Sequence, residues 1–165
     1  MNKNLIFLPL IALLSLTACS TTKDTNINPT LNDVANWKQV SYQQVTLKNL
    51  NLNGAGNIVY TKPGGYINAT ADYEYHCADC SPSSINQIIV GIAGFDAQAC
   101  LYNGSINGNG KANFMLKAPY QPGIYYIRFR YAQAFGCQDA IKYWWGVDKL
   151  PSAASNIGAI IVKPN

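Results

Sequence analysis

From Trp37 onward, apolar residues recur at every second position, in short segments separated by Gly, Pro and Asn. The clearest segment is Tyr66–His76, where apolar and polar positions alternate along its whole length. A period of two residues is typical of a strand with one face in a core and the other in solvent. One face of this strand would carry Ile67, Ala69, Ala71, Tyr73 and Tyr75.

A second segment, residues 85–93, holds the uninterrupted apolar run Ile88-Ile89-Val90, which predicts a central strand. In residues 45–52 the apolar phase changes between Leu47 and Leu50, which predicts a bulge or a break. Further strands are expected at residues 57–61, 98–102, 111–118, 124–133 and 157–163.

Turn signals separate these strands, among them Pro63-Gly64-Gly65, Gly94-Phe95-Asp96, Asn103-Gly104 and Gly108-Asn109-Gly110. No window has the pattern of an amphipathic helix. Short strands with Gly/Pro turns at this spacing indicate a sandwich or a barrel. We therefore expect an all-β fold, an antiparallel β-sandwich of about seven to eight strands.

One passage resembles a known architecture. Phe114-Met-Leu-Lys-Ala-Pro119, followed by Pro122-Gly-Ile-Tyr125 and a long strand, resembles the passage from strand E to strand F in immunoglobulin-like and fibronectin-like sandwiches. The resemblance implies an immunoglobulin-like sandwich and carries no function. The Cys–Trp–Cys order of antibody-type domains is missing.

The amino terminus has the parts of an export signal. Lys3 precedes an apolar run of 12 residues, Leu5 to Leu16, which is too short for the roughly 20 residues that a membrane-spanning helix needs. The run ends in Leu16-Thr17-Ala18-Cys19, which resembles the lipobox of bacterial lipoproteins. The resemblance implies a signal peptide over residues 1–18 and lipidation of Cys19.

By the same resemblance, Ser20 after the cysteine implies export to the outer membrane, where acyl chains would hold the protein. Residues 19–36 are polar, and such a stretch cannot bury enough apolar surface to offset its conformational entropy. We expect a lipidated flexible tether over residues 19–36 and a β-sandwich domain over residues 37–165.

Composition and charge narrow the class of partner. The 165 residues include 48% hydrophobic residues, 11 Tyr and 13 Gly, which suits strands and turns. Only 12% of residues are charged, which argues against a charged disordered chain. The net charge of +4 comes from scattered Lys and Arg, so no basic cluster points to nucleic acid.

Four cysteines remain after Cys19, and an even number in an exported chain indicates two disulfides. A bridge within Cys77-Ala-Asp-Cys80 would close a very small loop and add little stability. We therefore favour bridges from each of Cys77 and Cys80 to Cys100 and Cys137, with the choice between the two pairings left open.

Two alternatives use the same residues for chemistry. His76-Cys77-x-x-Cys80 has the donors of a zinc half-site, which Cys100 and Cys137 would complete, although a second CxxC is missing. Cys77 and Cys80 are also a candidate redox pair, although such a pair usually lies at a helix amino terminus. We expect neither a bound metal nor a cofactor.

Catalytic motifs are missing from the sequence. His76 is the only histidine, and no GxSxG elbow accompanies it. Asp72 and Glu74 are the only closely spaced carboxylates, and on the polar face of one strand they would serve solubility. We expect a protein that is not an enzyme, with no catalytic residues.

Residues 136–156 form an insertion between the last two strands and hold Tyr143-Trp144-Trp145. Exposed aromatic residues bind sugars or proteins, although large aromatics more often cover a core. Arg128 and Arg130 flank Phe129 on one strand face and are candidates to receive an anionic partner.

The leading hypothesis is a non-enzymatic outer-membrane lipoprotein that binds a partner protein or an envelope polymer. Its expected contact surface comprises Tyr143, Trp144, Trp145, Arg128 and Arg130. The alternatives are a carbohydrate-binding module that uses loop aromatics, a redox or metal-dependent envelope protein that uses His76, Cys77 and Cys80, and a purely structural role.

Overall fold

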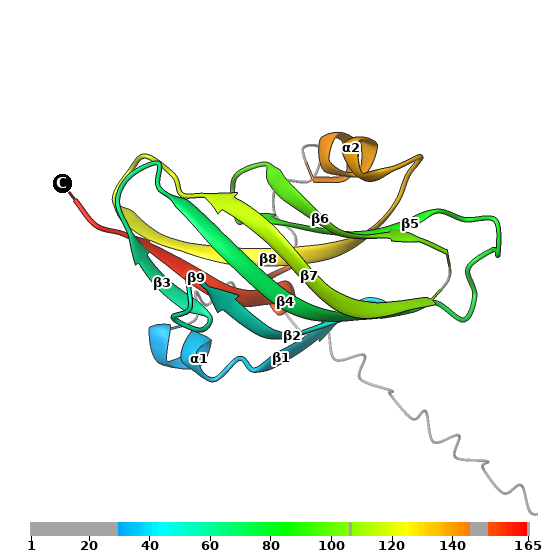
Figure 1. Cartoon of the computed structure of the whole chain (residues 1–165), viewed down its shortest axis with the longest axis horizontal. Helices are drawn as coiled ribbons and strands as arrows, with labels where there is room; N and C mark the ends of the chain where they lie inside the picture. Colours follow the sequence, from blue (N-terminus) through cyan, green and yellow to red (C-terminus); the bar gives the residue numbers. More distant parts are fainter. Residues whose placement is uncertain (1–29, 106, 146–151, 165) are drawn as a thin grey trace, which may run out of the picture.

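The computed structural model describes residues 30–105, 107–145 and 152–164, without the side chains of residues 143–145. Within these residues, nine strands form two stacked sheets (Figure 1). The four-stranded sheet has the order β1 (Gln39–Tyr42), β2 (Val45–Leu52), β4 (Tyr66–His76), β7 (Asn107–Lys117). The five-stranded sheet has the order β3 (Ile58–Thr61), β9 (Asn156–Val162), β8 (Gly123–Gln133), β5 (Asn86–Ile92), β6 (Ala97–Gly104).

The predicted all-β sandwich is confirmed. β4 pairs with β7 in one sheet, while β6, β5, β8 and β9 lie in that order in the other. This is the order of strands B and E against strands C′, C, F and G in immunoglobulin-like domains. The prediction of a wholly antiparallel fold is wrong at one edge, where β3 runs parallel to β9 with Ile58 opposite Ala159. The short strand β1 was not predicted.

β5 is the central strand that its apolar run predicted. It lies between β8 and β6, and all seven of its residues are buried. Ile88 and Val90 face the core between the sheets, while Ile89 belongs to a second cluster on the outer face with Ala132 and Ala140. A strand that is covered on both faces reads as a continuous apolar run, which explains its sequence.

The change of phase in β2 is a bulge, as predicted. The register of β2 against β4 shifts between Lys48 and Asn51, and Asn49 adopts a φ of 52°. The extra residue lets Leu47 and Leu50 both reach the core, although they are an odd number of positions apart.

Two predicted turns are wrong. Asn103-Gly104 lies within β6 and Gly108-Asn109-Gly110 within β7. A Cβ at Gly104 or at Gly108 would lie within 2.6 Å of the ring or hydroxyl of Tyr102. These glycines leave space for the ring of Tyr102 against the strand backbone, so here glycine marks a close contact inside a strand and not a turn.

The described helices are short: α1 (Leu31–Ala35), α2 (Cys137–Asp139), the π-helix η1 (Ala140–Trp145) and the 3-10 helix η2 (Ala153–Ser155). They were not predicted, because such lengths show no amphipathic period. None of the described helices has the length and apolarity to cross a membrane.

The predicted tether is too long at its carboxyl end. Thr30 and Asp33 form a capping box that starts α1, and Val34 in this helix is fully buried. Asn57 Nδ2 donates to the carbonyl oxygens of Val34 and Trp37 and fixes the helix to the domain. Residues 30–36, which the predicted tether included, are therefore part of the folded structure, and residues 19–29 lie outside the described residues.

The two ends of the sandwich differ in what they carry. At one end β4 ends, β5 begins and β7 begins, and Cys77 and Cys80 follow directly after β4. At the opposite end β4 begins, β5 and β7 end, and β6 and β8 begin; this is the left side of Figure 1, beside the carboxyl terminus.

Candidate functional site

The predicted contact surface is only partly described. Tyr143, Trp144 and Trp145 fall at the end of η1, and their side chains lie outside the described residues. Arg128 is only 8% exposed, and its Nε donates to Asn156 Oδ1 at 2.5 Å.

Burial lowers the pKa of the Arg128 guanidinium. Arg128 is therefore mostly buried and bonded to Asn156, and its role in receiving an anionic partner stays a prediction. Arg130, two residues along β8, is half-buried.

The four cysteines form two disulfides, and the favoured crosswise pairing is wrong. Cys77 pairs with Cys80, with Cα atoms 5.4 Å apart, and Cys100 pairs with Cys137 at 5.7 Å. Cys77 is buried in the core between the sheets, whereas Cys100 packs in the cluster on the outer face of the five-stranded sheet. A layer of strands separates them, so a bridge across it would require the backbone to move.

His76, Cys77 and Cys80 are the residues of the metal and redox alternatives. Cys77 and Cys80 form a disulfide, which is the oxidised state of a redox pair, and the described residues hold no group of three His, Cys, Asp or Glu that would bind a metal ion. His76 Nδ1 lies 2.7 Å from Asn107 Oδ1 on the outer face of β4, while Cys77 turns into the core.

Three tyrosine rings pack together in the core at the end of the molecule that holds the Cys77–Cys80 disulfide. The rings of Tyr75 and Tyr131 stack at 5.7 Å between centroids, and Tyr75 contacts Tyr102 at 5.6 Å. Tyr75 is 3% exposed, its hydroxyl lies 3.4 Å from Cys80 Sγ, and burial raises its pKa above the usual range. The tyrosine rings fill the core at this end, and a hollow of about 360 Å³ lies outside them, beside His76 and Asn107.

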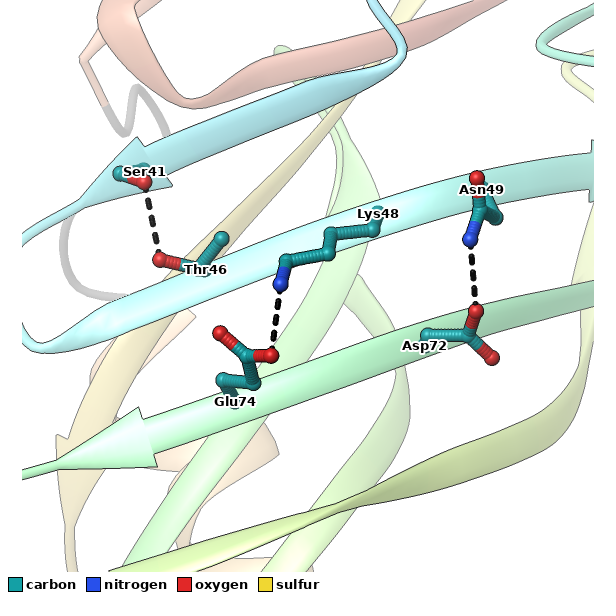
Figure 2. A network of polar contacts seen from close by, with 6 residues as sticks. All are labelled: Ser41, Thr46, Lys48, Asn49, Asp72 and Glu74. Atoms are coloured by element: carbon teal, nitrogen blue, oxygen red, sulfur yellow. Dashed lines mark hydrogen bonds and ion pairs between the residues drawn. The ribbon is translucent and has the colours of Figure 1, made fainter.

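The paired carboxylates are engaged with their neighbours on the outer face of the four-stranded sheet (Figure 2). Lys48 Nζ lies 2.6 Å from Glu74 Oε1, and Asn49 Nδ2 donates to Asp72 Oδ2 at 2.8 Å. These contacts join β2 to β4 across the sheet and do not form an acid–base pair.

A different surface, at the opposite end, has the features of a binding site. A hollow of about 480 Å³ lies between the β5–β6 turn, β6 and the end of β7 with the turn that follows it. Phe95, at 42% exposed, and Tyr120, at 70% exposed, are its aromatic residues. We call it the aromatic hollow, and it is lined by Phe95, Gln98, Lys117, Ala118, Pro119 and Tyr120.

Hydrogen bonds hold the walls of the aromatic hollow in place. Gln98 Oε1 accepts from the backbone N–H of Lys117 at 2.6 Å, and Gln98 Nε2 donates to the Lys117 carbonyl at 3.2 Å. Across the next turn, the Gly64 N–H donates to the Pro119 carbonyl. Gly64 has a φ of 67°, and a Cβ there would lie 2.6 Å from the Tyr120 ring. The ring of Tyr120 is therefore placed by its backbone surroundings.

Lys117 supplies a positive charge between two exposed rings. Its Nζ lies 5.2 Å from the centroid of Tyr120 and 5.7 Å from that of Tyr66, which is 63% exposed. A hydrogen bond and electrostatic attraction from Tyr120 raise the pKa of Lys117, so the side chain stays cationic. The only carboxylate in the turns that border the hollow is Asp96, next to Phe95.

This site was not predicted from the sequence, although a signal was present. Phe95 and Tyr120 stand inside the turn segments Gly94-Phe95-Asp96 and Pro119-Tyr120-Gln121-Pro122, where alternation offers no core position. A large aromatic at a turn tip is a candidate contact residue for that reason. This chain matches no protein-family model, no curated protein and no solved structure.

Proposed function

We propose that this protein is a non-enzymatic, lipid-anchored module of the bacterial envelope that binds carbohydrate at the aromatic hollow. One observation carries the proposal: Phe95 and Tyr120 present exposed rings to a preformed hollow that also holds an amide and an ammonium group.

Carbohydrate suits this combination of groups. A sugar ring offers C–H groups that pack on aromatic faces and hydroxyls that need hydrogen-bond partners at the rim. In the aromatic hollow, the rings of Tyr120 and Phe95 can pack on the C–H groups. Gln98 and Lys117 can form hydrogen bonds with the hydroxyls. Its volume of about 480 Å³ falls in the range of small-molecule sites.

The rigidity of the site favours binding further. Gln98 and Gly64 hold the backbone at Lys117 and Pro119, the residues that lead into Tyr120, so less backbone ordering is needed when a ligand binds. Binding sites that are ordered in advance lose less conformational entropy, which raises affinity for the same contacts.

Anchoring and location rest on the amino-terminal sequence. The lipobox-like Leu16-Thr17-Ala18-Cys19 and the following Ser20 support lipidation at Cys19 and retention at the outer membrane. Residues 19–29 would then link the lipid to the described part of the domain, where Thr30 caps α1. The partners of the protein would be the membrane, through the lipid, and a glycan, through the aromatic hollow.

The test uses the full chain, purified in detergent, against immobilised peptidoglycan, lipopolysaccharide, chitin, cellulose and α-glucan. We expect binding to at least one polymer and a loss of tenfold or more in Tyr120→Ala, which is about 1.4 kcal/mol. Tyr60→Ala is the matched control, since Tyr60 is 58% exposed and lies under Lys163, 4.6 Å from its ring centroid, outside the hollow.

Two outcomes would overturn the proposal. The first is equal affinity of Tyr120→Ala and Tyr60→Ala for every polymer that binds. The second is loss of binding in Trp144→Ala or Trp145→Ala with Tyr120→Ala unaffected, which would return the contact surface to residues 143–145. Both tyrosine variants should unfold within about 0.5 kcal/mol of the native chain, because the side chains are exposed.

A further inference from the structure

A second hollow, of about 410 Å³, lies on the outer face of the four-stranded sheet. Its lining comes from β2, the turn after it and β4. We call it the amide hollow, and it is lined by Asn51, Asn53, Gly54, Asn68 and Thr70.

The lining of the amide hollow is neutral and offers unused hydrogen-bonding groups. Asn53 is fixed, since its Oδ1 accepts from the Asn68 N–H at 2.8 Å. Within the described part of the chain, the side chains of Asn51, Asn68 and Thr70 make no hydrogen bond to other protein groups. Two amides and a hydroxyl therefore face solvent with both donors and acceptors, which matches the hydroxyls of a sugar.

Strand β4 runs from the amide hollow towards the aromatic hollow. Thr70, Asn68 and Tyr66 occupy alternate positions of β4, so their side chains share the outer face of the sheet. The span from Thr70 to Tyr66 is about 14 Å at the usual rise of a strand. Tyr66 in turn shares Lys117 with Tyr120, which places it at the border of the aromatic hollow.

We propose that the two hollows, with Tyr66 between them, form one extended site for a neutral glycan chain of several sugars. This inference rests on the proposed function and names its ligand more closely. One sugar would lie in the aromatic hollow, a second on the 63%-exposed ring of Tyr66, and the next would meet Asn68, Asn51 and Thr70.

The charges around the amide hollow favour a neutral sugar there. None of its lining residues is charged, so an anionic sugar would lose hydration without gaining a counter-charge. Asp72, the next outward residue of β4 after Thr70, adds a negative charge at that side, and its partner is the neutral amide of Asn49. Lys111 lies opposite Asp72 on β7, away from the lining.

The experiment measures how affinity depends on chain length. Full-length protein in detergent is titrated by calorimetry with chito-, cello- and malto-oligosaccharides of one to six sugars. For one of these series we expect affinity to rise about tenfold between two and five sugars and then to level off. In the double variant Asn51→Ala/Asn68→Ala we expect the five-sugar ligand to bind about tenfold more weakly, with two-sugar affinity unchanged within twofold.

Asn109→Ala is the matched control, because Asn109 is an exposed amide on the outer face of β7 that lines neither hollow. It should behave like the native protein. Thermal unfolding of the double variant confirms that its fold is intact, and Asn68→Asp, which adds a charge without changing size, should weaken only the longer ligands.

The outcomes separate the two proposals. Binding that needs Tyr120 but has the same affinity for two and for five sugars would overturn the extended site and leave the proposed function in place. If the affinity of Asn51→Ala/Asn68→Ala rose with the number of sugars as much as that of the native protein, the extended site would also be overturned and the proposed function would stand. Failure of every neutral oligosaccharide to bind would overturn the extended site, and failure of every polymer, charged or neutral, would overturn both proposals.

Discussion

Tyr75 and Tyr66 lie on the same strand, nine positions and about 30 Å apart, and have opposite fates. Tyr75 is 3% exposed, stacked on Tyr131 and in contact with Cys80. Tyr66 is 63% exposed, and Lys117 Nζ lies 5.7 Å from the centroid of its ring. Tyr75 fills the core at one end of the sandwich, and Tyr66 presents its ring to solvent at the other end.

The cause of the difference is the parity of the position. Odd-numbered residues of β4 face the core between the sheets, and even-numbered residues face solvent. A tyrosine at an odd position therefore contributes to stability, whereas Tyr66, at an even position, contributes surface. Residue type alone predicts neither role; alternation within the strand separates them.

The largest expected effects concern the two disulfides. Replacing Cys100 and Cys137 by Ala should lower the free energy of unfolding by about 4 kcal/mol, because the bridge closes a long loop. Replacing Cys77 and Cys80 by Ala should lower the free energy of unfolding by about 2 kcal/mol, since these cysteines are only three residues apart in sequence. Urea unfolding of the two double variants measures both.

The same experiment tests which cysteines are paired. Crosswise bridges from Cys77 and Cys80 to Cys100 and Cys137 would close two long loops. Nearly equal losses in the two double variants would therefore contradict the pairs Cys77–Cys80 and Cys100–Cys137.

Next in size is the contrast between the two tyrosines of β4. Tyr75→Ala should lower the free energy of unfolding by about 3 kcal/mol, because it leaves a cavity beside Tyr131 and Tyr102. Tyr66→Ala should stay within about 0.5 kcal/mol of the native chain. Equal losses in the two variants would show that the ring of Tyr66 also packs, and the assigned difference between the ends would be wrong.

The smallest expected effect is a dependence of stability on pH. Burial, reinforced by repulsion from Tyr131, raises the pKa of Tyr75 in the folded state. Above pH 10 the unfolded chain ionises this phenol while the folded chain does not, so stability falls as pH rises. The loss for this group is at most about 1.4 kcal/mol per pH unit.

Urea unfolding at pH 9 and at pH 11 isolates this contribution. Tyr75→Phe lacks the titrating hydroxyl and should lose less stability over that interval than the native chain. The same loss in both proteins would mean that the phenol of Tyr75 is not the group responsible.

Much of the fold was predictable from alternation, because each strand obeys a local rule. Tyr66–His76, the buried run of β5 and the bulge in β2 all follow from the spacing of apolar residues. The sequence could not reveal that Gly104 and Gly108 accommodate the ring of Tyr102, because that contact depends on how β6 and β7 meet.

The disulfides and the site required the fold. That Cys77 and Cys100 lie on opposite sides of a sheet is a property of strand packing, which loop-length arguments do not contain. The aromatic hollow brings Phe95, Gln98 and Tyr120 together from three segments of the chain. Its individual residues were visible in the sequence as aromatics in turns, but their proximity was not.

The most direct test of the account locates the ligand on the folded protein. Amide ¹H–¹⁵N spectra of the full chain in detergent would be recorded with and without an oligosaccharide that binds. We predict shifts at Phe95, Gln98 and Lys117 to Tyr120, extending to Tyr66 and Asn68 with longer ligands, and none at Tyr75 or Cys80. Shifts confined to the end with Tyr75, Cys80 and Tyr131 would contradict it.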